Sequence, residues 1–283
     1  MDEAGILAPD RAFPDRAGPY RRLMLTLTFL GTGTSNGVPM IGCDCPVCTS
    51  DDPRDFRNRT SAYLVWGGLH LLIDTATELR LQALKFGIRE VDAVLFTHAH
   101  ADHTGGFDEL RRFNELNQAH LPVYAGPDTA QILRERFSYA FEDVFPFYGG
   151  KPDLILHEIR GPFEIAGKTI VPIPVTHGRT NVLGFRFGPL AYVTDAKIVP
   201  PESVELLQGV DTLVINALRE RPHPTHLSFA DALELIEQIG PRRAYLVHLS
   251  HETSHVDASA LLPEGVEVAY DGLTITVDEF PSP

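Results

Sequence analysis

Short apolar runs alternate with amphipathic stretches along most of the chain. An alternating pattern of strand type begins at Met24, and runs of strand length recur as far as residue 277, several of them broken by Gly-Gly, Gly-Pro or Asp-Gly pairs that are typical of hairpin turns. Amphipathic stretches of helix length lie between these runs, at residues 77–87, 127–141 and 228–240. The first and third end in glycine, which suits a helix C-terminus, and Ser228 suits an N-cap. The pattern predicts strands interleaved with helices, a mixed α/β fold.

The first 23 residues lack this pattern. They are polar, contain several prolines and show no periodicity, so we expect a disordered or untranslated extension. Residues 24–280 contain no linker and no low-complexity tract, which predicts a single domain. No run approaches the roughly 18 apolar residues of a membrane span, and the N-terminus lacks the apolar core of a signal peptide. We expect a cytoplasmic protein.

Charge and cysteine content narrow the possible functions. The 283 residues carry a formal net charge of -14, whereas nucleic-acid binding depends on an excess of Lys and Arg, so a long nucleic acid is a poor candidate partner. A small anion held by metal ions stays possible. The three cysteines, Cys43, Cys45 and Cys48, lie within six residues, which favours a metal site or a reactive thiol over a disulfide framework.

The densest set of reactive side chains lies in LFTHAHADHTGG, residues 95–106. Four ligand-type residues directly follow an apolar run in this segment: His98, His100, Asp102 and His103. A strand that ends here would place them in a loop at its carboxyl edge. Imidazole and carboxylate together suit Zn, Mn or Fe, and neighbouring residues of a tight loop can serve two metal ions. The segment therefore predicts a binuclear metal site.

Three more ligand-type residues stand where apolar runs stop. VPIPVTHG contains His177, LAYVTDA contains Asp195, and AYLVHLSH contains His248. Each alone is an ordinary core or turn residue, but together, beside the segment 95–106, they supply the further ligands that two metal ions need.

The motif THAHADH, with the downstream histidine, aspartate and histidine, resembles the metallo-β-lactamase superfamily over roughly residues 24–280. The resemblance implies two mixed β-sheets sandwiched between helices, with the metals at the shared sheet edge. It implies two metal ions and a bridging carboxylate, the ligands being His98, His100 and His177 for one ion, Asp102, His103 and His248 for the other, and Asp195 for both. The β-lactamases lack this full set, whereas hydrolases of phosphodiesters and of some thioesters have it.

The cysteine cluster needs a fourth ligand to close a tetrahedral zinc shell. His251 lies three residues after His248 and is one candidate, while His255 is an open alternative. Three thiolates and one imidazole form a common closed structural zinc site. We expect one structural Zn2+ held by Cys43, Cys45, Cys48 and His251.

The stretch GTGTSNGVPMIGCDCPVC, together with HLSH, is similar to the phosphoribosyl 1,2-cyclic phosphate phosphodiesterases of the bacterial carbon–phosphorus lyase pathway. This resemblance implies the structural zinc beside two Mn2+ or Zn2+ ions, a possible homodimer, and a histidine that acts on the leaving group. His226 matches that histidine, with His223 as the alternative. Ser35, Asn36 and Arg179 are candidate contacts for the substrate phosphate.

The predicted activity is hydrolysis of a small cyclic phosphodiester, a ribose cyclic phosphate or a cyclic nucleotide. A hydroxide that bridges the two metal ions would attack phosphorus, with Asp102 and His226 as the catalytic residues of the site. Three alternatives stay open: a tRNA 3′-processing nuclease, a glyoxalase-type thioester hydrolase and a non-catalytic zinc-binding protein.

Overall fold

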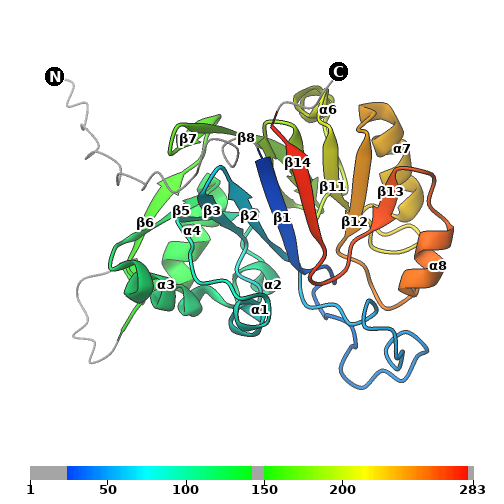
Figure 1. The fold of residues 1–283 in the computed structure, drawn as a ribbon, viewed down its shortest axis with the longest axis horizontal. Coiled ribbons are helices and arrows are strands. Elements are labelled where there is room, and N and C mark those ends of the chain that lie inside the picture. Colours follow the sequence, from blue (N-terminus) through cyan, green and yellow to red (C-terminus); the bar gives the residue numbers. More distant parts are fainter. Residues whose placement is uncertain (1–23, 142–149, 280–283) are drawn as a thin grey trace.

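Two seven-stranded mixed sheets form the centre of the computed structural model, which describes residues 24–141 and 150–279 (Figure 1). The first sheet has the strand order β14-β1-β2-β3-β4-β5-β6, with bounds Thr274–Asp278, Met24–Gly31, Ser61–Trp66, Leu69–Ile73, Ala93–Phe96, Leu121–Ala125 and Leu154–Glu158. The second has the order β13-β12-β11-β10-β9-β8-β7, with bounds Val266–Val268, Arg243–Val247, Thr212–Asn216, Leu190–Val193, Thr180–Phe187, Lys168–His177 and Phe163–Ile165. The predicted extension, residues 1–23, lies outside the described residues.

Helices cover the outer face of each sheet. The helices that accompany the first sheet are α1, α2, η2, α3, α4 and α5, at Leu79–Phe86, Ala101–Thr104, Phe107–Glu109, Leu110–Asn117, Pro127–Arg136 and Ser138–Phe141. The second is covered by α6, α7 and α8, at Pro201–Leu207, Phe229–Ile239 and His255–Ala260. Figure 1 shows the two groups of helices on opposite sides of the paired sheets. This arrangement confirms the predicted αβ/βα sandwich.

The core follows from the alternation of side chains along the strands. In β1 the inward residues Leu25, Leu27 and Phe29 are fully buried and pack between the sheets against residues such as Phe185 and Tyr192 of the second sheet. Separate buried clusters fill the space between each sheet and its helices. Burial on both faces of the central strands explains the nearly continuous apolar runs of the sequence.

Helix ends agree with the sequence in two of the three predicted helices. Gly87 and Gly240 are left-handed at the ends of α1 and α7, and Ser228 caps α7 through a hydrogen bond from the backbone N–H of Asp231. The predicted helix 127–141 is wrong in its continuity, because α4 ends at Arg136 and α5 begins at Ser138. Phe137 between them stacks on Phe107 at a ring distance of 4.1 Å.

One predicted hairpin is also wrong. The Asp-Gly pair at 271–272 does not join two paired strands, because β13 belongs to the second sheet and β14 to the first. The carboxylate of Asp271 accepts hydrogen bonds from the backbone N–H groups of Thr32 and Asn58, at 2.9 and 2.7 Å. These bonds hold the turn 271–272 against the end of β1. At this turn the chain passes from β13 in the second sheet to β14 in the first.

Among the described residues, no helix combines the length and the apolar character that crossing a membrane requires.

Candidate metal centre

Strand ends from both sheets bring the predicted ligands together. Asp195 follows β10, His248 follows β12 and Asp74 follows β3, and all three have positive φ angles, of 54°, 63° and 59°. Non-glycine residues seldom adopt this conformation, which turns the chain sharply out of the strand and is enriched at functional sites. The sharp turns direct these side chains across the edge shared by the two sheets.

Asp74 is a residue that the sequence analysis missed. Its fully buried carboxylate lies 2.8 Å from Nδ1 of His103 and accepts hydrogen bonds from the backbone N–H and the hydroxyl of Thr97, both at 2.8 Å. It thereby fixes the His103 ring with Nδ1 protonated and Nε2 directed into the centre. The available signal was its position after the apolar run LHLLI, which is the same signal that identified Asp195 and His248.

The rings of His248 and His177 are oriented in a similar way. Nδ1 of His248 lies 3.0 Å from the hydroxyl of Thr60, and Nδ1 of His177 donates to the backbone carbonyl of Thr225 at 2.7 Å. Each contact leaves Nε2 for the centre. Polar partners of this kind are typical of metal-bound histidines, because they set the tautomer and the direction of the ring.

Ligand-type atoms crowd around Asp195. One of its carboxylate oxygens lies 3.2 Å from Nε2 of His103 and the other lies 3.2 Å from Nε2 of His248. Asp102 places an oxygen 3.3 Å from the same His103 nitrogen, and Nε2 of His98 lies 2.9 Å from Nδ1 of His100. A carboxylate that faces two imidazoles with its two oxygens has the arrangement of a bridging ligand.

The residues fit divalent cations. Nε2 of His103 is buried and has no hydrogen-bond partner within the described chain. Its lone pair faces the oxygens of Asp102 and Asp195, an arrangement that is repulsive unless a proton or a cation lies between them. Burial alone would lower the pKa of His103, but the carboxylates of Asp195 and Asp74 raise it well above its ordinary value. A positive charge is therefore required at this point, and either a proton or a divalent cation can supply it.

Protonation states in the centre also suit metal binding. Burial would raise the pKa of Asp195, but His248 and His103 hold it well below its usual range, so the carboxylate is charged. Burial lowers the pKa values of His98 and His248, so both rings are neutral. Charged carboxylates and neutral imidazoles are the forms that bind metal ions.

The division of the ligands between two ions stays a prediction. The atoms of His98, His103 and Asp195 lie within 4.8 Å of one another, and so do those of His177, Asp195 and His226. Asp195 belongs to both groups. His226, which the sequence placed near the leaving group, is thus also close enough to join a ligand set.

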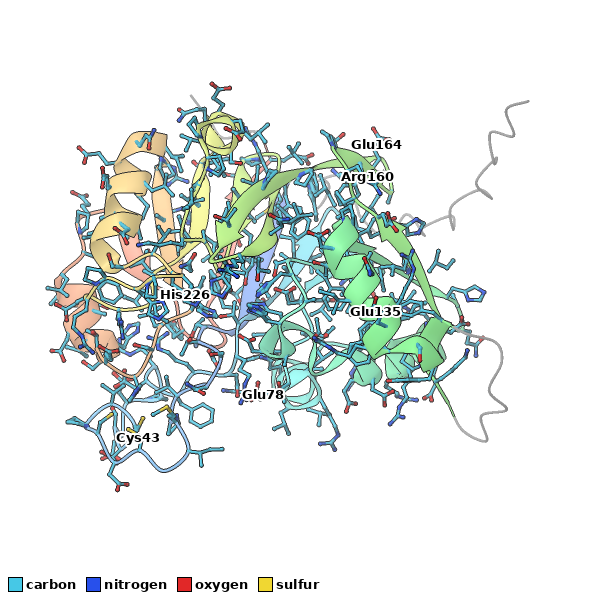
Figure 2. All side chains as sticks on the ribbon, turned by 180° about the vertical axis from the view of Figure 1, so that it is seen from behind. Cys43, Glu78, Glu135, Arg160, Glu164 and His226 are labelled. Atoms are coloured by element: carbon cyan, nitrogen blue, oxygen red, sulfur yellow. The ribbon has the colours of Figure 1, made fainter. Side chains whose placement is uncertain are left out.

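His226 lies in the wall of the centre. It is 8% exposed, and its ring centroid lies 4.3 Å from that of His177 and 4.8 Å from that of His248. Figure 2 shows it in the central part of the molecule, between the two groups of helices. Its Nδ1 is buried without a hydrogen-bond partner in the described chain, 3.8 Å from Asp195. Burial and the neighbouring His248 lower its pKa to about 3, so the ring is neutral at pH 7.

A pocket of about 230 Å³ opens beside His226. Its wall includes Ser35, Asn36, His223 and His226, so two of the three predicted substrate contacts line it. The third, Arg179, is exposed in the turn between β8 and β9 and is not part of this wall.

The cysteine cluster closes with His251. Nδ1 of His251 lies 3.3 Å from the Sγ atoms of both Cys43 and Cys45, close to the roughly 3.5 Å that a tetrahedral zinc shell implies. The backbone N–H of Cys48 and the side chain of His251 lower the pKa of the Cys45 thiol to about 6, which favours the metal-binding thiolate. The alternative ligand, His255, instead faces Arg57 at 3.3 Å.

A sequence model of the beta-lactamase superfamily domain matches residues 70–249. The chain belongs to the beta-lactamase superfamily. It is similar to a crystal structure described as a new diphosphatase from the PhnP family, with a TM-score of 0.84 and 39% identity over 90% of this chain and 98% of that one. Membership of this superfamily and the likeness to this structure support a metal-dependent hydrolase.

Two curated relatives have other names. An octanoyltransferase of Porphyromonas gingivalis is 41% identical over 256 residues, which are 88% of this chain and 51% of that protein. This chain therefore spans about half of that relative, whose name describes the whole protein. The ribonuclease Z of Myxococcus xanthus is 25% identical over 326 aligned positions, covering 89% of this chain and 97% of that protein.

Proposed function

We propose that this beta-lactamase superfamily chain is a phosphodiesterase that hydrolyses a small cyclic phosphodiester, a ribose cyclic phosphate or a cyclic nucleotide. The observation that carries the proposal is the position of Asp195, which faces imidazoles on both sides at 3.2 Å and lies 3.8 Å from His226 in the wall of the 230 Å³ pocket. The proposed metal ligands are His98, His100, Asp102, His103, His177, Asp195 and His248. The proposed ions are two Mn2+ or Zn2+, with one structural Zn2+ at the cysteine cluster.

Divalent cations bound here would lower the pKa of water towards about 7 and neutralise charge on a phosphate group. The chain's own residues would do the rest. Asp74 and Thr60 hold the His103 and His248 rings in place, so the ligand set needs little reorganisation. His226 is neutral at pH 7 and can donate a hydrogen bond from its N–H to a departing alkoxide. To transfer a proton and return to the neutral ring, it would first have to take one up, which the negative charge of a bound phosphate would favour.

Pocket size and charge support a small substrate. A volume of 230 Å³ suits one sugar or one phosphate-bearing unit, whereas a folded RNA would need an extended basic surface. The net charge of -14 argues against such a surface. The PhnP-family relative is described as a diphosphatase, so a diphosphate ester belongs among the substrates to be compared.

The test is a substrate panel with the purified, metal-loaded chain. We expect turnover of bis-p-nitrophenyl phosphate and faster turnover of a cyclic ribose phosphate or a cyclic nucleotide, with Asp195→Ala abolishing both. A diphosphate ester and an octanoyl thioester, chosen for the names of two relatives, complete the panel. Faster hydrolysis of the thioester than of any phosphate ester would overturn the proposal in favour of the thioester hydrolase.

A tRNA 3′-processing nuclease is the second candidate, because the ribonuclease Z of Myxococcus xanthus matches 89% of this chain. Cleavage of a precursor tRNA, weakened steeply by added salt as the release of bound counterions predicts, would favour this candidate. Undiminished activity on cyclic phosphodiesters in the presence of competing tRNA would favour the small-molecule enzyme.

A further inference from the structure

The cysteine cluster and the pocket share a segment of chain. His251 places Nδ1 3.3 Å from the Sγ of Cys45 and also lines the pocket. Its neighbour Glu252 lines the pocket as well, together with Ser35 and Asn36. A displacement of His251 in the cluster would therefore move a wall of the pocket.

Backbone pairing connects the two walls. The N–H of Leu249 donates to the carbonyl of Thr32, and the N–H of Thr34 donates to the carbonyl of Leu249, both at 3.0 Å. The strand of chain that carries His248, His251 and Glu252 is thus paired with the segment that leads into Ser35. These two backbone hydrogen bonds therefore connect the segment that carries ligands of the metal centre and of the cluster with the pocket wall.

Glu252 extends this connection to the loop that carries His226. It forms ion pairs with Arg219 at 2.7 Å and with Arg221 at 2.6 Å. Arg219 also lines the pocket. A change in the position of segment 250–252 can therefore be transmitted to Arg219 and to segment 34–37, which also line the pocket.

The loop that holds the cysteines contains little regular structure. Besides the thiols, Asp55 links it to the body by accepting a hydrogen bond from the backbone N–H of His255 at 2.6 Å. Residues 39–56 contain no helix and no strand, and Ile41 is 98% exposed. Figure 1 shows this loop protruding from the body of the molecule, and Figure 2 places Cys43 within it. The contact of the thiols with His251 is therefore a principal link between the loop and the pocket wall.

We propose that the Cys43, Cys45, Cys48 and His251 cluster shapes the substrate pocket, so that a metal ion bound there sets substrate affinity and not the rate of the chemical step. This inference rests on the proposed function, because the ligand of the pocket is the phosphodiester. The bound ion would fix His251, and through it the distance between the wall 250–252 and the wall 34–37. The cluster would then serve recognition in addition to folding.

The test is Cys45→Ser, assayed with excess Mn2+ so that the metal centre stays loaded. We expect a lower melting temperature, loss of one zinc per chain, kcat within about twofold of wild type, and a KM for the cyclic phosphodiester raised by about tenfold. The Kd for inorganic phosphate, measured by calorimetry, should rise by the same factor, because a pocket defect weakens ground-state binding without chemistry.

Leu207→Ala is the matched control. Leu207 is fully buried in α6, which lies at the end of the molecule opposite the cysteine loop in Figure 1, so the variant should also lower the melting temperature. Its KM and its Kd for phosphate should stay at the wild-type values. An unchanged KM and Kd in Cys45→Ser would overturn the inference and leave the cluster a purely structural site.

A measurement on the wild-type chain covers the case in which Cys45→Ser does not fold. With Co2+ at the cluster, inorganic phosphate should shift the thiolate-to-cobalt absorption, because linkage between two sites is reciprocal. No shift at saturating phosphate would overturn the inference. Failure of the proposed function looks different, because the wild-type chain would then hydrolyse no phosphodiester at all.

Discussion

At the scale of single residues, a side chain such as His103 makes two kinds of contact, one that orients its ring and one that faces the metal centre. His103 contacts Asp74 through Nδ1 and faces Asp102 and Asp195 through Nε2. The first contact fixes the ring, and the second directs its lone pair to the place where a cation is needed. His226 differs, since its Nδ1 is buried without a hydrogen-bond partner in the described chain. Its ring also lines the pocket, which places it beside the proposed substrate.

His226→Ala should separate proton donation from metal binding. A general acid matters for a poor alkoxide leaving group and little for p-nitrophenolate, which departs without a proton. We expect the rate on a cyclic ribose phosphate to fall by ~10²-fold or more, with the rate on bis-p-nitrophenyl phosphate within a few fold of wild type. Steady-state kinetics on both substrates, with metal analysis of the variant, measures this.

Asp195→Ala is the comparison, since loss of a metal ligand should damage both rates. Equal losses on both substrates for His226→Ala would make His226 a metal ligand or a binding residue, as its proximity to His177 and Asp195 allows. If neither rate changes, His223 is the next candidate, because its ring lies 5.3 Å from that of His226 in the same pocket wall.

His255 should make stability depend on pH. It is 6% exposed, and burial together with Arg57 lowers its pKa to about 4. A histidine of the unfolded chain titrates near about 6.5, so the unfolded state takes up the proton first, and the free energy of unfolding falls as the pH falls from about 6.5 towards about 4.

In His255→Gln this proton uptake is absent. The slope of the free energy of unfolding against pH should be shallower by up to about 1.4 kcal/mol per pH unit in that window. Urea denaturation at a series of pH values measures it. The same slope in variant and wild type would show that His255 does not carry the effect.

At the scale of elements, the close approach of the end of β1 to the backbone at Arg59 helps to position the pocket wall at Ser35. A Cβ atom added to Gly31, the last residue of β1, would overlap the backbone carbonyl of Arg59. Arg59 in turn donates from Nε to the carbonyl of Ser35 at 2.8 Å and forms an ion pair with Glu78 just before α1. The end of β1, the pocket loop and α1 are thus tied through one arginine.

Gly31→Ala should therefore push the end of β1 away from the backbone at Arg59. We expect a loss of roughly 2–4 kcal/mol in the free energy of unfolding, because the overlapping atoms belong to backbone and cannot rotate away. The matched control is Gly161→Ala, where an added Cβ meets nothing within 4 Å. Chemical denaturation of both variants tests this. Equal stability of the two would mean that β1 and segment 57–60 move apart at little cost.

At the scale of the whole molecule, the chain should hold three metal ions. Seven ligand-type residues gather at the sheet edge, and three thiols and His251 form a separate set. We expect elemental analysis to find three ions per chain, one of them resistant to mild chelation, because thiolates hold zinc in a closed shell. A single ion at full occupancy would contradict this count.

Sequence by itself determined the fold class, most helix and strand positions, the three thiols and the segment His98–His103. The physical reason is local: apolar runs with period two or 3.6 report burial, and His98 to His103 supply their chemistry within six residues. The same local signal identified His177, Asp195 and His248 at strand ends. Ser228 and Gly240 likewise predicted the ends of α7 correctly.

Only the tertiary structure decided how these parts meet. Nothing local distinguishes His251 from His255 as the partner of the thiols, because that choice depends on which ring faces the thiols and which faces Arg57. The role of Asp74 needs the approach of β3 to the loop after β4, and the pairing of β14 with β1 overrides the Asp-Gly hairpin signal. Such contacts join residues far apart in the chain, so they become visible only when the two sheets pack together.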